Sequence, residues 1–152
     1  MPLVPPELRI GVLADTHDRL PSSVVDRLSQ CDQIWHLGDV CEPSTLIELE
    51  GLGKPLSIVR GNCDANIDWP LMIETKLAGK NFVLTHIPPE HAPMGTDFLL
   101  HGHTHVPRDQ MVYGTRFLNP GCVTRPNRGA QPSFAYLTIT AKKAIQWELV
   151  RI

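Results

Sequence analysis

Short apolar runs alternate with polar, helix-like stretches over the first two thirds of the chain. Runs rich in Ile, Val, Leu and Phe that lack strict alternation are typical of strands buried on both faces. Five such strands are expected, at Ile10–Ala14, Gln33–Leu37, Leu56–Val59, Phe82–Thr85 and Phe98–Leu100. Amphipathic helices are expected between the first three strands, at Pro21–Ser29 and Pro43–Leu52. This β-α-β-α-β order predicts a parallel sheet covered by helices.

The last third of the chain has the pattern of antiparallel strands. Met111–Tyr113 and Arg116–Leu118 flank a tight turn at Gly114-Thr115, which predicts a hairpin. Apolar and polar residues alternate in Ile145–Leu149, and Ser133–Thr140 is its expected partner. The predicted fold is α/β (α+β): a four-layer αββα sandwich of two mixed sheets flanked by helices. It forms a single domain over residues 1–152, in which residues 1–7 are expected to be a loose tail because of their prolines.

Composition restricts the function. A chain of 152 residues, 42% hydrophobic and 20% charged, suits one globular domain. A net charge of −2 argues against non-specific nucleic-acid binding, and no apolar run is long enough to span a membrane. The start of the chain does not resemble a secretory signal, and the cysteines form no C-x-x-C pair. We therefore expect a cytoplasmic protein with reduced cysteines, without a disulfide framework or a thiolate zinc site. No feature indicates a particular oligomeric state.

Polar motifs follow each of the five predicted buried strands. In order along the chain they are Asp15-Thr16-His17, Gly38-Asp39, Gly61-Asn62-Cys63-Asp64, His86 and Gly102-His103-Thr104-His105. Each motif is short enough to arise by chance, but all of them in order after apolar runs form a strong signal. Because ligands bind beyond the carboxyl ends of strands in α/β sheets, we expect these groups to converge on one edge of one sheet.

The residue types in these motifs indicate a metal centre. Carboxylate, imidazole and amide ligands without thiolate suit Mn²⁺, Fe²⁺, Zn²⁺ or Ni²⁺. Seven such residues with one shared carboxylate suffice for two adjacent divalent ions. With Asp15 and Asp39 as the only charged ligands, the site would keep a small positive charge, which suits a singly charged phosphodiester.

Taken together, these motifs resemble the calcineurin-like metallophosphoesterase superfamily, and most closely its small, cap-less prokaryotic phosphodiesterases. The resemblance extends from Asp15-Thr16-His17 to the late Asn119-Pro120-Gly121 turn. It implies an αββα sandwich that hydrolyses small phosphate esters, with a metal-bridging hydroxide as nucleophile and Mn²⁺ as the favoured metal. It further implies that one ion is held by Asp15, His17 and His105, the other by Asn62, His86 and His103, and that Asp39 bridges the two.

Two features depart from the family pattern. Cys63 stands where many members have a histidine after the asparagine, and a thiol is a weak proton donor, so slower chemistry and a preference for good leaving groups are expected. Asp64 is expected to shape the turn or support the ligands, with general base as the alternative. The proline-rich stretch Ile87–Thr96 is expected to be irregular where the family usually has a helix.

Several residues and functions are left with alternatives. Arg125, Arg128 and His91 are candidate substrate contacts, or solvated side chains; His36 and His101 are expected to be hydrogen-bonded histidines rather than ligands. The main functional hypothesis is a two-metal phosphodiesterase. The alternatives are a non-catalytic interaction module of the same fold, and a phosphomonoesterase or nucleotide pyrophosphatase.

Overall fold

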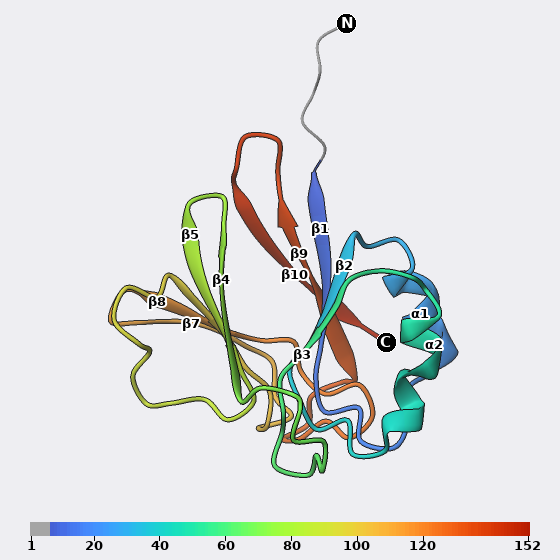
Figure 1. The fold of residues 1–152 in the computed structure, drawn as a ribbon. Helices are drawn as coiled ribbons and strands as arrows, with labels where there is room; N and C mark the ends of the chain where they lie inside the picture. Colours follow the sequence, from blue (N-terminus) through green and yellow to red (C-terminus); the bar gives the residue numbers. More distant parts are fainter. Residues whose placement is uncertain (1–6) are drawn as a thin grey trace, which may run out of the picture.

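Two mixed β-sheets packed face to face form the frame of the protein (Figure 1). The computed structural model describes residues 7–152. The first sheet has the spatial order β10 (Ile145–Arg151), β9 (Ser133–Ile139), β1 (Leu8–Leu13), β2 (Gln33–His36) and β3 (Leu56–Ile58). The second sheet has the order β4 (Met72–Leu77), β5 (Lys80–Thr85), β6 (Phe98–Leu100), β8 (Thr115–Asn119) and β7 (Arg108–Val112). The predicted sandwich of two mixed sheets is confirmed.

Helices cover the first sheet only, which corrects the expected four layers to three within residues 7–152. Helix α1 (Ser22–Leu28), the 3₁₀ turn η1 (Pro43–Leu46) and the short helix α2 (Ile47–Glu50) lie on its outer face (Figure 1). Their apolar residues, such as Leu28 and Leu49, pack in one cluster with Leu13 and Ile34 of the sheet. Within residues 7–152 the outer face of the second sheet carries no helix, because the segment 87–96 is irregular, as its prolines predict.

The main core lies between the sheets and explains why the central strands lack alternation. On β1, Ile10 and Val12 face the second sheet, whereas Leu13 packs against the helices, and all three are fully buried. Trp35 of β2 meets Phe82 of β5 edge to face across this core, with ring centroids 6.0 Å apart. Burial of each such side chain contributes roughly 1.5–3 kcal/mol to folding, so the strand ends that carry the polar motifs are held on a rigid base.

The sandwich places the polar motifs on two sheets, which corrects one expectation. Strands β1, β2 and β3 run parallel in the first sheet, while β5 and β6 run parallel in the second. The motifs therefore do not share one edge of one sheet. Instead, the carboxyl ends of both parallel sets point to the same end of the sandwich, at the bottom of Figure 1. Of the predicted tail, residues 1–6 lie outside the described residues.

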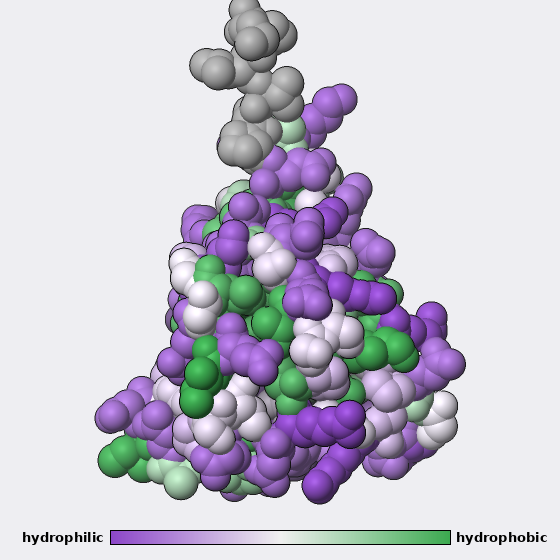
Figure 2. All heavy atoms as spheres, turned by 90° about the vertical axis from the view of Figure 1, so that its right-hand side faces the viewer, coloured by the Kyte–Doolittle hydropathy of each residue, from purple (hydrophilic) through white to green (hydrophobic). Residues whose placement is uncertain are grey.

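On the helix-bearing side, hydrophilic and apolar side chains interleave over the surface (Figure 2). Over residues 7–152, none of the helices has the length and apolar character needed to cross a bilayer.

Candidate metal centre

The loops after β2, β3, β5 and β6 bring four of the predicted ligands into direct contact. The His86 Nε2 atom lies 3.2 Å from Asp39 Oδ2 and 3.0 Å from Asn62 Oδ1. The same Asn62 oxygen lies 3.1 Å from His103 Nδ1. These four side chains thus point their donor atoms at one small space.

The other three predicted ligands form a second group beside the first. The Nε2 atoms of His17 and His105 lie 3.2 Å apart, and His105 Nε2 lies 3.4 Å from Asp15 Oδ1. Asp15 Oδ1 is also 3.8 Å from His86 Nε2, which joins the two groups. All seven candidate ligands therefore lie in one contiguous cluster at the end of the sandwich.

One oxygen of the buried Asp15 carboxylate lacks a partner in the described part of the chain, and a metal ion would supply it. Within residues 7–152, Asp15 Oδ1 is a buried side-chain oxygen without any hydrogen-bond partner. Burial, opposed by the nearby His86 and His105, raises the pKa of Asp15 to about 6. Such a group is costly to ionise unless a cation accompanies it. The residues present therefore fit a divalent ion.

Asp39 and His86 form a hydrogen-bonded pair whose pKa values are shifted in opposite directions. Burial alone would raise the pKa of Asp39, but hydrogen bonds from His86 and from the Cys63 backbone lower it to about 2. Burial lowers the pKa of His86, but the hydrogen bond with Asp39 and the charge of Asp15 outweigh it and raise the pKa above its ordinary value. Asp39 is thus an anion at neutral pH, as a bridging ligand must be.

Backbone carbonyls fix the orientation of two imidazoles. His86 Nδ1 lies 2.8 Å from the Leu37 carbonyl, and His105 Nδ1 lies 2.7 Å from the Arg125 carbonyl. Because each Nδ1–H donates to a carbonyl, Nε2 is the ring nitrogen that faces the cluster. A metal ion bound there would take the place of the Nε2 proton that His86 shares with Asp39.

The backbone around the cluster is strained at the ligands themselves. Five candidate ligands have positive φ: Asp15 (55°), His17 (51°), Asp39 (60°), His103 (75°) and His105 (61°). Non-glycine residues in this region cost roughly 1–3 kcal/mol each and cluster at functional sites. Interloop hydrogen bonds hold the strained residues, including Asp15 N to the Gly38 carbonyl and His17 N to the Asp39 carbonyl, both 2.9 Å.

Asp64 joins the loops after β2 and β3. Its carboxylate accepts hydrogen bonds from the backbone N–H groups of Asp39 (2.9 Å), Cys41 (2.8 Å) and Gly61 (2.7 Å). These three hydrogen bonds join the backbones of two ligand loops, which is the geometry expected of a supporting residue.

Replacement of Asp64 should weaken metal binding without removing a ligand. The asparagine side chain of Asp64→Asn would offer one neutral oxygen to the three backbone N–H groups that the carboxylate binds, so the ligand loops should be held less firmly. We therefore expect metal affinity to fall roughly 10- to 100-fold. Titration calorimetry with Mn²⁺ would measure the change. The matched control is Asp68→Asn, an exposed carboxylate in the same loop, which should leave affinity unaltered. Equal affinities for the two variants would contradict this role.

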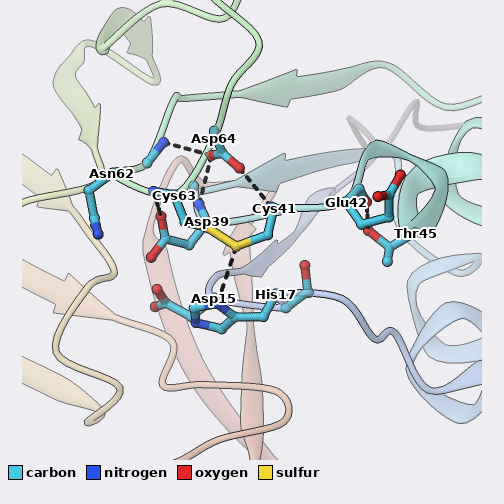
Figure 3. Close-up of a disulfide and its surroundings, with 12 residues drawn as sticks. Asp15, His17, Asp39, Cys41, Glu42, Thr45, Asn62, Cys63 and Asp64 are labelled. Atoms are coloured by element: carbon cyan, nitrogen blue, oxygen red, sulfur yellow. Dashed lines mark hydrogen bonds between the residues drawn. A yellow bond between two sulfur atoms is a disulfide. The ribbon is translucent and has the colours of Figure 1, made fainter.

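A disulfide between Cys41 and Cys63 corrects the expectation of reduced cysteines (Figure 3). Only Cys31 and Cys122 are free, and both are buried. In this bonded form, Cys63 has no S–H group and cannot act as the weak proton donor expected from the sequence. The two half-cystines are 22 positions apart and come from different ligand loops.

The remaining predicted contacts lie at different places. Arg128 lines a hollow of about 630 Å³ beside His103, whereas Arg125 contributes its carbonyl to His105. His91 is not brought to the cluster; it lines a separate hollow with Tyr113, and their ring centroids are 5.5 Å apart.

Two supporting residues were not assigned a role from the sequence. Cys41 lies 3.3 Å from His17 Nδ1. Buried Asn119 donates to the Gly102 carbonyl and to Thr104, and its position in the Asn-Pro-Gly turn was the available signal.

The buried histidine His36 should make stability depend on pH. Burial lowers its pKa to about 4, and it bonds Thr16 Oγ1 and the Gly38 N–H as a neutral ring. Since the unfolded ring binds its proton at about pH 6.5, this stabilisation is complete above that pH and is lost as the pH falls toward 4. At pH 5 the loss is about 2 kcal/mol relative to pH 7.5.

The comparison that isolates this effect is between the wild type and His36→Gln. Asp15, with its raised pKa of about 6, changes stability in the opposite direction over this range and is common to both proteins. Urea unfolding at both pH values, with chelator present, should show a smaller acid loss in the variant. An equal loss in both proteins would show that His36 does not resist protonation.

Comparison with known proteins identifies the family of the chain. Residues 8–142 match the model of the calcineurin-like phosphoesterase superfamily domain. A probable metallophosphoesterase of Methanothermobacter thermautotrophicus is 32% identical over 160 residues, covering 93% of this chain and 91% of the relative. Phosphodiesterase YfcE of Escherichia coli is 28% identical over 160 residues, covering 86% of this chain and 87% of the relative.

Solved structures show the same fold. The structure of YfcE, a phosphoesterase from E. coli, aligns with a TM-score of 0.77 at 25% identity, covering 95% of this chain and all of that chain (100%). Vps29 of Entamoeba histolytica complexed with zinc has a TM-score of 0.73 at 23% identity, covering 95% and 99%, and shares the fold alone. The chain belongs to the calcineurin-like phosphoesterase superfamily. It is thus a metallophosphoesterase by family, a class of phosphate-ester hydrolases that use divalent metal ions.

Proposed function

We propose that this protein is a phosphodiesterase that uses two divalent metal ions. The observation that carries the proposal is the pair of ligand groups, one around Asn62, His86 and His103 and one around Asp15, His17 and His105, with Asp39 in contact with the first. Asp39 would be shared between the ions. When bound, the two ions lower the pKa of water to supply a nucleophile and neutralise charge on the phosphoryl oxygens.

The side chains of the cluster favour a singly charged diester. Two divalent ions would carry more positive charge than Asp15, Asp39 and a hydroxide can neutralise, because the histidines and Asn62 are neutral as ligands. A carboxylate in place of Asn62 would cancel this remaining positive charge. Beside His103, the hollow is lined by Arg108 and Arg128, which add positive charge near the substrate phosphate. Oxygen and nitrogen ligands without thiolate suit Mn²⁺, which we propose as the metal.

The test is hydrolysis of an activated aryl phosphodiester by purified protein with added Mn²⁺. We expect turnover of the diester with a higher kcat/KM than for the matching aryl monoester, and none after treatment with a chelator. A higher kcat/KM for the monoester or for a nucleotide pyrophosphate would show that this compound, rather than a diester, is the preferred class of substrate. No turnover with Mn²⁺, Zn²⁺, Fe²⁺ or Ni²⁺ would contradict the proposal.

One observation favours a second candidate, a non-catalytic interaction module. No helix covers the second sheet within residues 7–152, and the exposed apolar side chains of Met72 (46%) and Ile87 (54%) line an open hollow there. A module of this kind would not need all seven ligands to be present. The activity assay separates the two candidates, because only the phosphodiesterase requires turnover.

A further inference from the structure

Two cysteines from different ligand loops meet at the edge of the metal centre. Cys41 follows Asp39 by two positions, and Cys63 directly follows Asn62. Their sulfurs form a disulfide, and Cys41 Sγ lies 3.3 Å from His17 Nδ1 (Figure 3). The ring nitrogen of His17 that faces away from His105 therefore faces sulfur.

The loops are held together by contacts other than the disulfide. The Asp64 carboxylate binds backbone N–H groups on both loops, and the Cys63 N–H donates to Asp39 Oδ1 at 3.0 Å. Breaking the S–S bond leaves these hydrogen bonds in place. The two sulfurs would then stay close to each other and to His17.

The disulfide is open to a reductant. Cys63 is exposed, whereas the free cysteines Cys31 and Cys122 are 1% and 0% exposed. A dithiol reductant can supply two electrons and two protons: it attacks one sulfur, the S–S bond breaks, and two cysteine thiols form while the dithiol closes to its own disulfide. The reaction thus converts an inert pair into two potential ligands.

We propose that reduced Cys41 and Cys63, together with His17 Nδ1, form a binding site for a soft divalent cation of the Zn²⁺ class. The three donor atoms all lie within 4.8 Å of one another. Ligands of one tetrahedral zinc ion lie roughly 3.6–3.8 Å apart, as follows from its bond lengths, so small movements of freed sulfurs suffice. Thiolate ligands select Zn²⁺ or Cd²⁺ over Mn²⁺.

This site would compete with the proposed dinuclear centre for His17, a consequence that rests on the proposed function. A neutral imidazole has one lone pair, so ligation through Nδ1 places the proton on Nε2. His17 Nε2 is the atom that lies 3.2 Å from His105 Nε2 in the cluster. Zinc bound by the reduced protein would therefore remove His17 from the hydrolytic site.

The first experiment uses Cd²⁺ as the probe, without Mn²⁺ or substrate. We expect the full chain, reduced by a dithiol that is then removed, to bind one Cd²⁺ and show a thiolate-to-cadmium absorption band. The oxidised protein and the Cys41→Ser/Cys63→Ser variant should lack the band, and the control Cys31→Ala should retain it. Thiol counting by alkylation and mass spectrometry establishes the redox state of each sample.

A reduced protein that has four free thiols but shows no cadmium band would overturn the proposal. So would a failure of air or a disulfide oxidant to re-form the Cys41–Cys63 bond. Because the band is independent of hydrolysis, an inactive protein that shows it contradicts the phosphodiesterase but supports this site. In an active protein, we expect the reduced form to be about tenfold more sensitive to Zn²⁺ than the oxidised form or the double serine variant. Equal sensitivity of the three samples would overturn the competition for His17.

Discussion

Asp39→Asn should reduce phosphodiester hydrolysis by at least about a thousandfold. Asp39 is 3% exposed and contacts His86 Nε2 at 3.2 Å, and its low pKa of about 2 keeps it ionised. Asparagine has the same shape and can still accept the Cys63 N–H, so the fold should survive. It lacks the negative charge needed to bind between two cations. The effect should appear in kcat/KM with Mn²⁺ present in excess.

Asp109→Asn is the matched control for this substitution. Asp109 is paired with Arg116 on β7 and β8, at 2.8 Å and away from the candidate ligands. Such a half-exposed ion pair contributes little to stability, and activity should stay within about twofold of the wild type. If Asp39→Asn hydrolysed the diester as fast as this control, the bridging role of Asp39 would be refuted.

Gly61→Ala should displace the Asp39 carboxylate, because Gly61 packs directly against it. A Cβ at Gly61 would overlap the side chain and backbone nitrogen of Asp39. Because backbone cannot move aside cheaply, we expect a loss of roughly 1–3 kcal/mol in stability and loss of metal-dependent activity. Thermal unfolding with and without Mn²⁺ measures the first effect and shows whether metal still stabilises the variant.

The control is Gly51→Ala, after helix α2. Gly51 has an ordinary helical backbone, and a Cβ there would meet its nearest atoms at 3.4 Å. Alanine should be tolerated at this position or be slightly stabilising. If Gly61→Ala behaved like Gly51→Ala, the close packing of the loop against Asp39 would have no role in the site.

The sequence predicted the buried strands well because burial on both faces produces continuous apolar runs, as in β1. It did not predict β4, although Ile73, Thr75 and Leu77 alternate with charged or polar residues and a turn at Ala78-Gly79 follows. The expected long helix at Pro43–Leu52 is a 3₁₀ turn followed by only one turn of α-helix. Strand β4 lies at the edge of its sheet, and the helical segment begins as a 3₁₀ turn, a difference that local sequence pattern specifies poorly.

The candidate ligands could be found from sequence because each directly follows an apolar strand. The division of these strands between two sheets could not, since local pattern does not specify which strands pair. The Cys41–Cys63 bond likewise depends on how two loops pack, and neither cysteine has a local partner signal. The placement of His91 away from the cluster depends on the path of an irregular segment, which its prolines do not define.

Location of bound manganese by anomalous scattering tests the central claim most directly. In a crystal of the protein grown with Mn²⁺, we expect two anomalous peaks per chain. One should lie among Asp15, His17 and His105 and the other among Asn62, His86 and His103, with the Asp39 carboxylate contacting both. A single peak, or peaks outside this cluster, would contradict a dinuclear centre built from these seven side chains.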